Sequence, residues 1–502
     1  MKRFIDILLS VAVLPMLVSC GKDFLERYPK GTWIAENITD KEVQEIPYAV
    51  LIEGELANAY ANQHSYDFSA AAPVLHCITT DDAVKGSTEP DFGVAIPFEA
   101  HTWDASAGIV NQYYSTWYNV ITYSNRAIQY ADGASQYDST ISEADASYFK
   151  AQAITLRAHA YFRLIQAFGD IPYVDRELGQ DEKTPARTPK DEIYAQLVTQ
   201  LEWAIPNLKT RAAMVAAGDL GRVSQNSARA ILAKIYMYQK DWANSRVWTD
   251  AIISSGDNDL STPFDQIWTE AQEFGPESVY EMDLDYKPSL SIESTGNRQW
   301  ANIQGFRGQP NAGWGINGPS PVLRADMAGD PRYEATVLSD GDVREGVTFQ
   351  SASVPNPYYN AKCYAPLAEQ NAYNRNSANA QWMNIRVIRY SDIVLMHAES
   401  ACELGDLADA RQKLEMVRAR ARGGKAGVLP EITTDNQAEL RKAIHSERRF
   451  ELAMEFERYF DLVRWDETDK ISGFVKGTQE LFPIPQRQID ASNGILTQNP
   501  GY

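Results

Sequence analysis

Two segments far apart in the chain share one design, in which an apolar stripe at helical spacing is followed by a turn and a second stripe. They cover residues 228–251 and 390–417, with turns at Asp241 and Asp406. Apolar residues three or four positions apart lie on one face of a helix, so each segment predicts two helices packed against each other. A chain with two such pairs must bury both apolar faces, which favours a mainly α fold.

Small alanines at the positions where the paired helices touch resemble those of tetratricopeptide repeats. The two segments are not contiguous, so we do not expect a solenoid with a regular period of about 34 residues. Further helical patterns occupy residues 111–130, 144–168 and 191–208. The middle one is apolar on two sides and should be buried between neighbours. The predicted fold is a mainly α, tetratricopeptide-like helical-repeat scaffold.

Between residues 256 and 384 the helical periodicity gives way to glycine, proline, asparagine and short β-like runs. Long loops are uncommon in compact domains unless they are functional. We therefore expect a loop-rich, minor-β subdomain here that carries the ligand surface.

The first residues read as a targeting signal. Lys2 and Arg3 precede a mostly apolar stretch over residues 5–18, and the letters LVSC end at Cys20. They resemble the bacterial lipobox, which predicts Cys20 as a lipid anchor whose several acyl chains give stable membrane attachment. Gly21 stands where an aspartate would favour retention in the inner membrane, so we expect the outer membrane. The alternative is an ordinary cleaved signal with an incidental cysteine.

The predicted organisation has five parts. They are a lipoprotein signal peptide at 1–19, a lipid anchor and tether at 20–40, a helical-repeat scaffold with a ligand-facing loop at 41–255, the loop-rich ligand-binding subdomain at 256–384, and C-terminal repeat helices with a terminal segment at 385–502.

Charge and motifs exclude several functions. A formal net charge of −20 argues against a nucleic-acid partner, which needs a basic face. Cys77, Cys363 and Cys402 fit no zinc pattern and no redox pair, and they allow one disulfide at most. The sequence has no H-E-x-x-H, G-x-S-x-G or Walker A motif. We expect no metal, no cofactor and no catalysis.

Gly313, Gly315 and Gly318 match the dinucleotide-binding pattern G-x-G-x-x-G. That pattern binds phosphate only between a buried strand and a helix N-terminus, and here turn-like residues precede it and Pro319 follows. At best a short helix capped by Ser320 comes next. We therefore reject a nucleotide site and expect the glycines to let the backbone turn and expose aromatic rings.

The window 297–318 is rich in aromatic rings and amides. Flat rings can stack on the C–H faces of sugars, and amides and arginine hydrogen-bond to hydroxyl groups. The predicted glycan-binding residues here are Trp300, Phe306, Arg307, Asn311 and Trp314. The alternative is that Trp314 and Phe306 only fasten the loop to the scaffold.

Two acidic pairs need a different interpretation. Asp81 and Asp82 are adjacent, so on an extended chain they point in opposite directions and make a poor acid–base couple. One of them could hydrogen-bond to a ligand, and a solvated loop is the alternative. Glu451 and Glu455, on a predicted helix over 447–465, have Arg448 and Arg458 three or four residues away. We expect a structural ion network there.

Four stretches resemble one family. Residues 156–174, 385–406, 447–465 and 481–502 are similar to the characteristic segments of SusD/RagB-type lipoproteins of Bacteroidetes, with Ser492-Asn493-Gly494 where Asn-Pro is commoner. The loop with Asp81 and Asp82 resembles one near the ligand groove of that family.

The resemblance implies a helical-repeat scaffold with a loop-rich ligand surface. It also implies a non-catalytic, cell-surface protein that captures oligosaccharide or polysaccharide as the lid of a SusC-like TonB-dependent transporter. RagB-like relatives serve peptide uptake, so peptide capture is an alternative ligand class. A helical glycoside hydrolase and a structural repeat adaptor are the remaining alternatives.

Overall fold

The computed structural model describes residues 48–63, 70–179, 182–284, 300–310, 313–372 and 382–502. Residues 49–502 form one compact unit. The predicted signal peptide and tether, Cys20 and Asn311 lie outside the described residues. None of the helices in the described ranges is long and apolar enough to cross a membrane.

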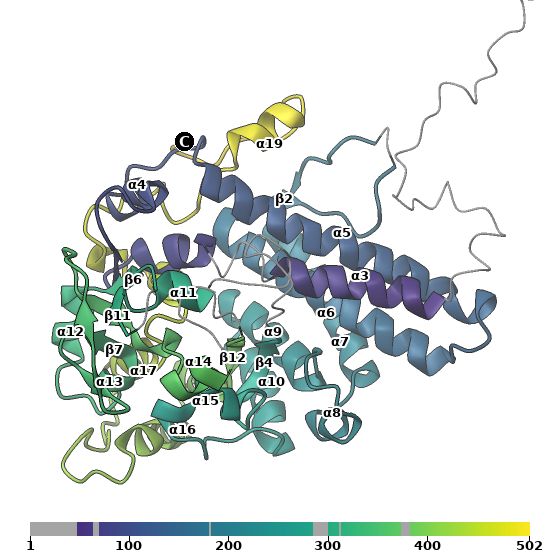
Figure 1. Cartoon of the computed structure of the whole chain (residues 1–502). Helices are drawn as coiled ribbons and strands as arrows, with labels where there is room; N and C mark the ends of the chain where they lie inside the picture. The colour runs from purple at the N-terminus through teal and green to yellow at the C-terminus, as the bar shows by residue number, and fades with distance from the viewer. Residues whose placement is uncertain (1–47, 64–69, 180–181, 285–299, 311–312, 373–381) are drawn as a thin grey trace, which may run out of the picture. The chain divides into compact units, whose positions relative to one another are not determined.

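Long helices packed side by side make up most of this unit (Figure 1). They are α3 (Tyr48–Gln63), α5 (Gly108–Tyr137), α6 (Glu143–Phe168), α7 (Lys190–Asn207), α9 (Gln225–Tyr238), α10 (Trp242–Ser255), α15 (Tyr390–Glu403), α16 (Leu407–Arg422) and α17 (Gln437–Glu451). The two predicted pairs are α9–α10 and α15–α16, and α10 packs against α15. Two pairs distant in sequence therefore stack as neighbours, which confirms the mainly α, repeat-like scaffold.

Helix α6 is the centre of the scaffold. It begins at a capping box between Ser142 and Asp145, and every residue from Ala151 to Phe168 is buried. It packs against α5 on one side and α7 and α9 on others, as a helix that is apolar on two faces must. Its buried polar residues have partners, for example His159, whose Nδ1 lies 3.1 Å from Oε1 of Gln63.

The end of α6 is completed by residues more than 300 positions later. Gly169 stops the helix with φ 70°, which leaves its last carbonyl groups without helical partners. The backbone N–H of Phe482 donates to the carbonyl of Ala167 at 2.7 Å. The side-chain amide of Asn499 donates to Phe168 O at 3.0 Å and to Phe482 O at 2.7 Å. The terminal segment thus caps a helix of the first half.

Short antiparallel strand pairs and short helices connect the long helices and make up most of the loop-rich part. The pairs are β1 (Ala83–Gly86) with β6 (Ile316–Pro319), β2 (Ile171–Pro172) with β3 (Arg187–Thr188), β4 (Ser278–Met282) with β12 (Ile385–Arg389), β5 (Gly308–Gln309) with β10 (Gln350–Ser351), β7 (Val337–Ser339) with β11 (Tyr358–Asn360), and β8 (Val343–Arg344) with β9 (Val347–Thr348). The shorter helices are α4 (Ile96–Glu99), α8 (Arg211–Ala217), α11 (Trp300–Gln304), α12 (Pro321–Asp326), α13 (Tyr333–Thr336), α14 (Leu367–Ala372), α18 (Arg458–Arg464) and α19 (Gln486–Ala491). In Figure 1, β6, β7, β11, α12 and α13 of the loop-rich part lie away from α5, α6 and α7, whereas β2 lies beside α5.

The predicted single helix over 447–465 is wrong. Helix α17 ends at Glu451 and α18 starts at Arg458, because Met454 and Phe456 take left-handed backbone angles, with φ 65° and 69°. Glu455 therefore lies in the link between the helices and not one turn beyond Glu451.

The structural ion network is confirmed, although its partners come from other elements. Glu451 is fully buried and accepts hydrogen bonds from Arg389 at 2.8 Å, Arg332 at 3.1 Å and Arg420 at 2.5 Å. Arg448 pairs instead with Asp392 and Asp461. The network joins α16, α17, β12 and the link between α12 and α13, so it fastens the loop-rich part to the scaffold.

The described cysteines are all free thiols. Cys77 and Cys363 lie in one buried apolar cluster, and Cys402 is buried in α15. Burial raises the pKa of Cys77 to about 12, so its thiol stays protonated and unreactive at neutral pH.

Replacing Glu451 tests the network. Glu451→Gln removes the charge that three buried arginines share, and we expect the free energy of unfolding, measured by urea denaturation, to fall by about 3–5 kcal/mol. Glu431→Ala, at an exposed glutamate, is the control and should change it by less than about 0.5 kcal/mol. Equal losses in the two variants would contradict a structural role for the network.

The effect of Glu451→Gln on the free energy of unfolding should also depend on pH. Burial alone would raise the pKa of Glu451, but the charges of Arg420, Arg389 and Arg332 outweigh it and hold the pKa well below its usual value. The stability that this carboxylate contributes is therefore present above the unfolded-state pKa of about 4.3 and is lost as pH falls further. The difference in free energy of unfolding between the wild type and Glu451→Gln, measured by urea denaturation, should therefore become smaller below about pH 4.

Candidate ligand-binding surface

The glycine-rich motif is a place where two backbone segments touch. The N–H groups of Gly313, Trp314 and Gly315 donate to the carbonyls of Phe306, Asn302 and Gly305 at 2.8, 2.9 and 3.0 Å. A Cβ on Gly313 would lie 2.5 Å from backbone atoms of Gly305. These glycines are needed for close approach, and strand β6 follows them directly. The short helix capped by Ser320 is present as α12. Strand β6 contains Gly318 and separates Gly313 and Gly315 from α12, so the motif lacks the order of strand, glycine turn and helix that a phosphate site requires.

This turn projects Trp314 outward, with 40% of its surface exposed. Arg307 lies behind it and fixes a second loop, because its guanidinium donates to Ser87 Oγ at 2.6 Å and pairs with Asp91 at 2.7 Å. Thr88 also donates to the same Asp91 oxygen at 2.5 Å. We call Trp314, Arg307, Asp91, Ser87 and Thr88 together the Trp314 surface.

The charges on this surface are fixed at neutral pH. Hydrogen bonds from Thr88 and Ser87, with the charge of Arg307, lower the pKa of Asp91 to about 2. The carboxylate and the guanidinium therefore neutralise each other, and both remain able to hydrogen-bond outward because each side chain is about one-third exposed.

Two of the predicted platform residues are packing residues. Trp300 is 6% exposed, lies in a buried cluster and donates its ring N–H to the carbonyl of Met383 at 2.7 Å. Phe306 is 1% exposed and packs against Phe349 and Tyr359. Neither ring presents a face to solvent, so the expectation that they stack on a ligand is corrected. Trp314 and Arg307 are the described residues of that set that reach the surface.

Asp81 and Asp82 also have structural partners. Arg458 donates two hydrogen bonds to Asp81 at 2.8 and 2.7 Å, and Arg449 donates one to Asp82 at 2.7 Å. Burial raises the pKa of Asp81, but Arg458 and Arg449 outweigh that effect and lower it. Both carboxylates are ion-paired with arginines and at most 8% exposed, which corrects the expectation of a ligand contact. They fasten the start of β1 to α17 and α18.

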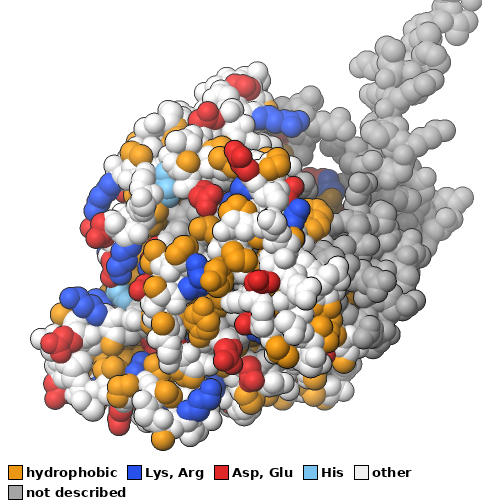
Figure 2. Space-filling model, turned by 60° about the vertical axis from the view of Figure 1, so that its left-hand side comes forward, with side chains coloured by type: hydrophobic (Ala, Val, Ile, Leu, Met, Phe, Trp, Pro, Cys, Tyr) orange, Lys and Arg blue, Asp and Glu red, His pale blue; other side chains and the backbone are white. Residues whose placement is uncertain are grey.

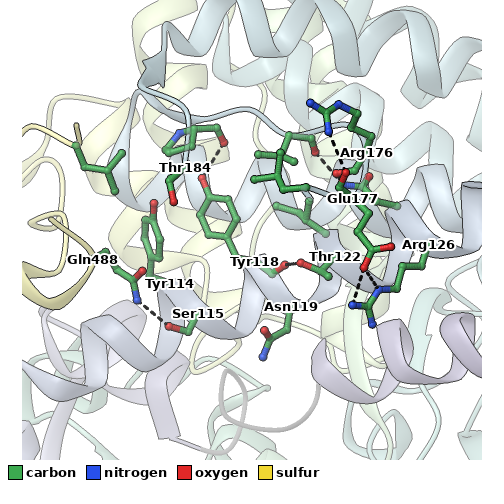
Figure 3. A pocket seen from close by; sticks show the side chains of 16 residues that line it. Tyr114, Ser115, Tyr118, Asn119, Thr122, Arg126, Arg176, Glu177, Thr184 and Gln488 are labelled. Carbon is green, nitrogen blue, oxygen red and sulfur yellow. Dashed lines mark hydrogen bonds and ion pairs between the residues drawn. The ribbon is translucent and has the colours of Figure 1, made fainter. Parts of the chain in front are cut away.

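Sequence reasoning missed a groove on the outer face of α5, which we call the α5 groove (Figure 3). It has a volume of about 430 Å³. Its walls come from α5, from the segment between β2 and β3, and from the residues around α19. They include Tyr114, Tyr118, Thr122, Arg126, Glu177 and Gln488. Its polar residues look like the solvated face of an amphipathic helix in sequence, so no signal marked them.

The face of the loop-rich part is chemically mixed. Figure 2 shows acidic and basic side chains dispersed among apolar and neutral ones there, without a continuous basic area. Within the described ranges, no group of three histidine, cysteine, aspartate or glutamate residues could hold a metal ion.

Comparison with known proteins gives consistent matches. Residues 299–474 match a model described as the SusD family, and residues 40–237 match one described as starch-binding and associating with the outer membrane. The SusD-like protein P2 of Formosa agariphila is 25% identical, over 69% of this chain and 72% of its own length. A SusD-like protein of Bacteroides ovatus is 24% identical, over 91% and 82%.

Solved structures share the fold. A laminarin-binding SusD-like protein superposes with a TM-score of 0.76 at 25% identity, covering 90% of this chain and 99% of that one. Surface glycan-binding protein A of Bacteroides thetaiotaomicron, in complex with laminarihexaose, gives a TM-score of 0.75 at 22% identity, covering 89% and 98%.

The turn that carries Trp314 can be tested through its glycine. We expect Gly313→Ala to lower the free energy of unfolding by about 1–3 kcal/mol, because the new methyl group would overlap the backbone of Gly305. Gly108→Ala is the control, since a methyl group there meets nothing within 4 Å. If both variants unfold at the same urea concentration, the close approach of the two segments is wrong.

Proposed function

The chain belongs to the SusD family, and from this we propose that it is a cell-surface, lipid-anchored protein that captures a glycan without cleaving it. The captured glycan would pass to a SusC-like TonB-dependent transporter in the outer membrane. The laminarin-binding relative, which matches 90% of this chain, supports a carbohydrate ligand.

The exposed indole of Trp314 is the observation that carries the proposal for the site. Its flat apolar ring is carried by a turn that backbone hydrogen bonds hold in place, and the hydrogen-bonding groups of Arg307 and Asp91 lie next to that turn. Sugar rings have apolar C–H faces and hydroxyl edges, and this surface offers a partner for each. Because the surface is open, selectivity would come from shape and affinity would be modest.

The charge state of the surface supports binding without catalysis. A glycoside hydrolase needs a carboxylic acid with a raised pKa and a second carboxylate across the substrate. On the Trp314 surface the acidic residue is Asp91, whose pKa is lowered to about 2. Asp81 and Asp82 are held by Arg458 and Arg449. Burial raises the pKa of Asp82, but its side chain is 1% exposed and ion-paired with Arg449, so it does not face the Trp314 surface as a general acid would have to.

The family supports the proposed transporter partner, and the lipobox supports the proposed anchor. Lipidated Cys20 would hold the chain to the outer membrane, and the residues before it would be removed. The matching family description includes association with the outer membrane. Peptide capture of the RagB kind is the second ligand class to test, because the same transport arrangement would serve it.

Replacing Trp314 tests the site. We expect Trp314→Ala in the soluble chain 22–502 to weaken glycan binding at least about tenfold, equivalent to about 1.4 kcal/mol, because the stacking face is lost. Trp203→Ala is a matched control, since Trp203 is also 40% exposed but lies on α7. Binding is measured by titration calorimetry with laminarin, other neutral and acidic polysaccharides, and a peptide digest.

Each outcome has a clear meaning. Binding of a glycan without cleavage, weakened only by Trp314→Ala, supports the proposal. Binding of peptides alone would replace the ligand class, and absence of any ligand would favour a structural adaptor. Glycan binding that survives Trp314→Ala would place the site elsewhere.

A further inference from the structure

The α5 groove is a separate concavity from the Trp314 surface, and no residue of that surface lines it. Its volume of about 430 Å³ is within the range of about 300–1,000 Å³ for small-ligand sites. Three parts of the chain meet there, namely the middle of α5, residues 172–178 with Thr184, and Gln488 with Leu496. Figure 3 shows Tyr114 and Tyr118 rising from α5 towards the segment with Thr184, with Gln488 beside Tyr114.

The lining combines one partly exposed ring with neutral polar groups. That ring is Tyr118, whose hydroxyl donates to Pro172 O at 2.8 Å. Tyr114 is only 4% exposed and supports the Tyr118 ring from the side, with ring centroids 4.6 Å apart. The amide N–H of Gln488 donates to Asn111 at 2.9 Å and to Ser115 at 3.3 Å. Asn119 and Thr122 are exposed and add an amide and a hydroxyl. Hydroxyl and amide groups can exchange hydrogen bonds with a polyol.

The charged residues of the lining are already paired. Arg126 contacts Glu177 at 2.8 Å, and Arg176 contacts Glu182 with two bonds of 2.5 and 2.7 Å. A charged ligand would have to compete with these partners, whereas a neutral ligand would not. The partly exposed ring of Tyr118, the neutral donors and acceptors and the balanced charge together favour an uncharged polyhydroxylated ligand.

We propose that the α5 groove is a second carbohydrate site, which takes one unit of a neutral saccharide. It stands on its own geometry and does not depend on the Trp314 surface. Two sites on one chain would hold a polysaccharide at two points, and the second contact would then form at a high effective concentration.

Filling the groove tests this proposal. Thr122 is an exposed threonine of α5 that lines the groove, and its hydroxyl donates to the carbonyl four residues earlier at 3.0 Å. Thr199 on α7 is exposed and makes the same bond at 3.1 Å, but it lies outside the groove. Thr122→Trp should block the groove, and Thr199→Trp controls for a new surface indole on a helix.

The measurement uses saturation-transfer NMR on the chain 22–502 with Trp314→Ala, so that the Trp314 surface does not contribute. The probes are glucose, galactose, mannose and xylose, with glucuronate as the charged counterpart. We expect at least one neutral sugar to receive saturation, and we expect Thr122→Trp to abolish the transfer while Thr199→Trp leaves it unchanged. Gln488→Ala should reduce it by removing an amide from the wall.

Several results would overturn the proposal. They are no transfer to any neutral sugar, transfer to glucuronate alone, or transfer to a neutral sugar that persists in Thr122→Trp. Native-like thermal unfolding of both tryptophan variants establishes that a loss is local. Failure here is distinguishable from failure of the proposed function, because glycan capture at the Trp314 surface is measured separately by calorimetry of the wild type and Trp314→Ala.

Discussion

The ion pairs of the buried Glu451 carboxylate are the interaction on which the placement of the loop-rich part against the helical scaffold depends. The carboxylate is shared by arginines from β12, α16 and the link between α12 and α13, and each contributes a charge-assisted hydrogen bond. Removing ions from water is expensive, so such a cluster is stable only when every charge has its partner. The strands of the loop-rich part are short, and its own apolar cluster around Phe306, Phe349 and Tyr359 is small. Its attachment to the helices therefore relies on this directional network as well as on apolar contact.

The same logic extends to the ligand-facing loops. Asp81 and Asp82 are bound by Arg458 and Arg449, which fastens β1, and β1 pairs with β6 next to the glycine-rich turn. Arg307 then fixes the loop that contains Asp91. The exposed Trp314 is thus positioned by a series of ion pairs and close backbone contacts that starts at the helices. A loop held in this way can present a ring with little loss of conformational entropy when a ligand binds.

Periodicity predicted the elements well and the exposure of single side chains poorly. The stripe over 144–168 corresponds to α6, and the paired patterns correspond to α9–α10 and α15–α16, because burial of a helix face follows directly from spacing. Trp300 and Phe306 could not be assigned, since an aromatic ring suits both a core and a sugar platform and only tertiary packing decides. The break after Glu451 was missed because the sequence continues in helix-forming residues there. The groove on α5 depends on residues from three distant segments, which no local pattern reveals.

The cap on α6 also bears on how the chain reaches its native state. The carbonyl group of Ala167 finds its donor in Phe482, and that of Phe168 accepts from Asn499 as well as from Arg187, so the full set of hydrogen bonds at the end of the central helix forms only after residues more than 300 positions downstream have been synthesised. Docking of the terminal segment is therefore a late step in completing the core of the first half.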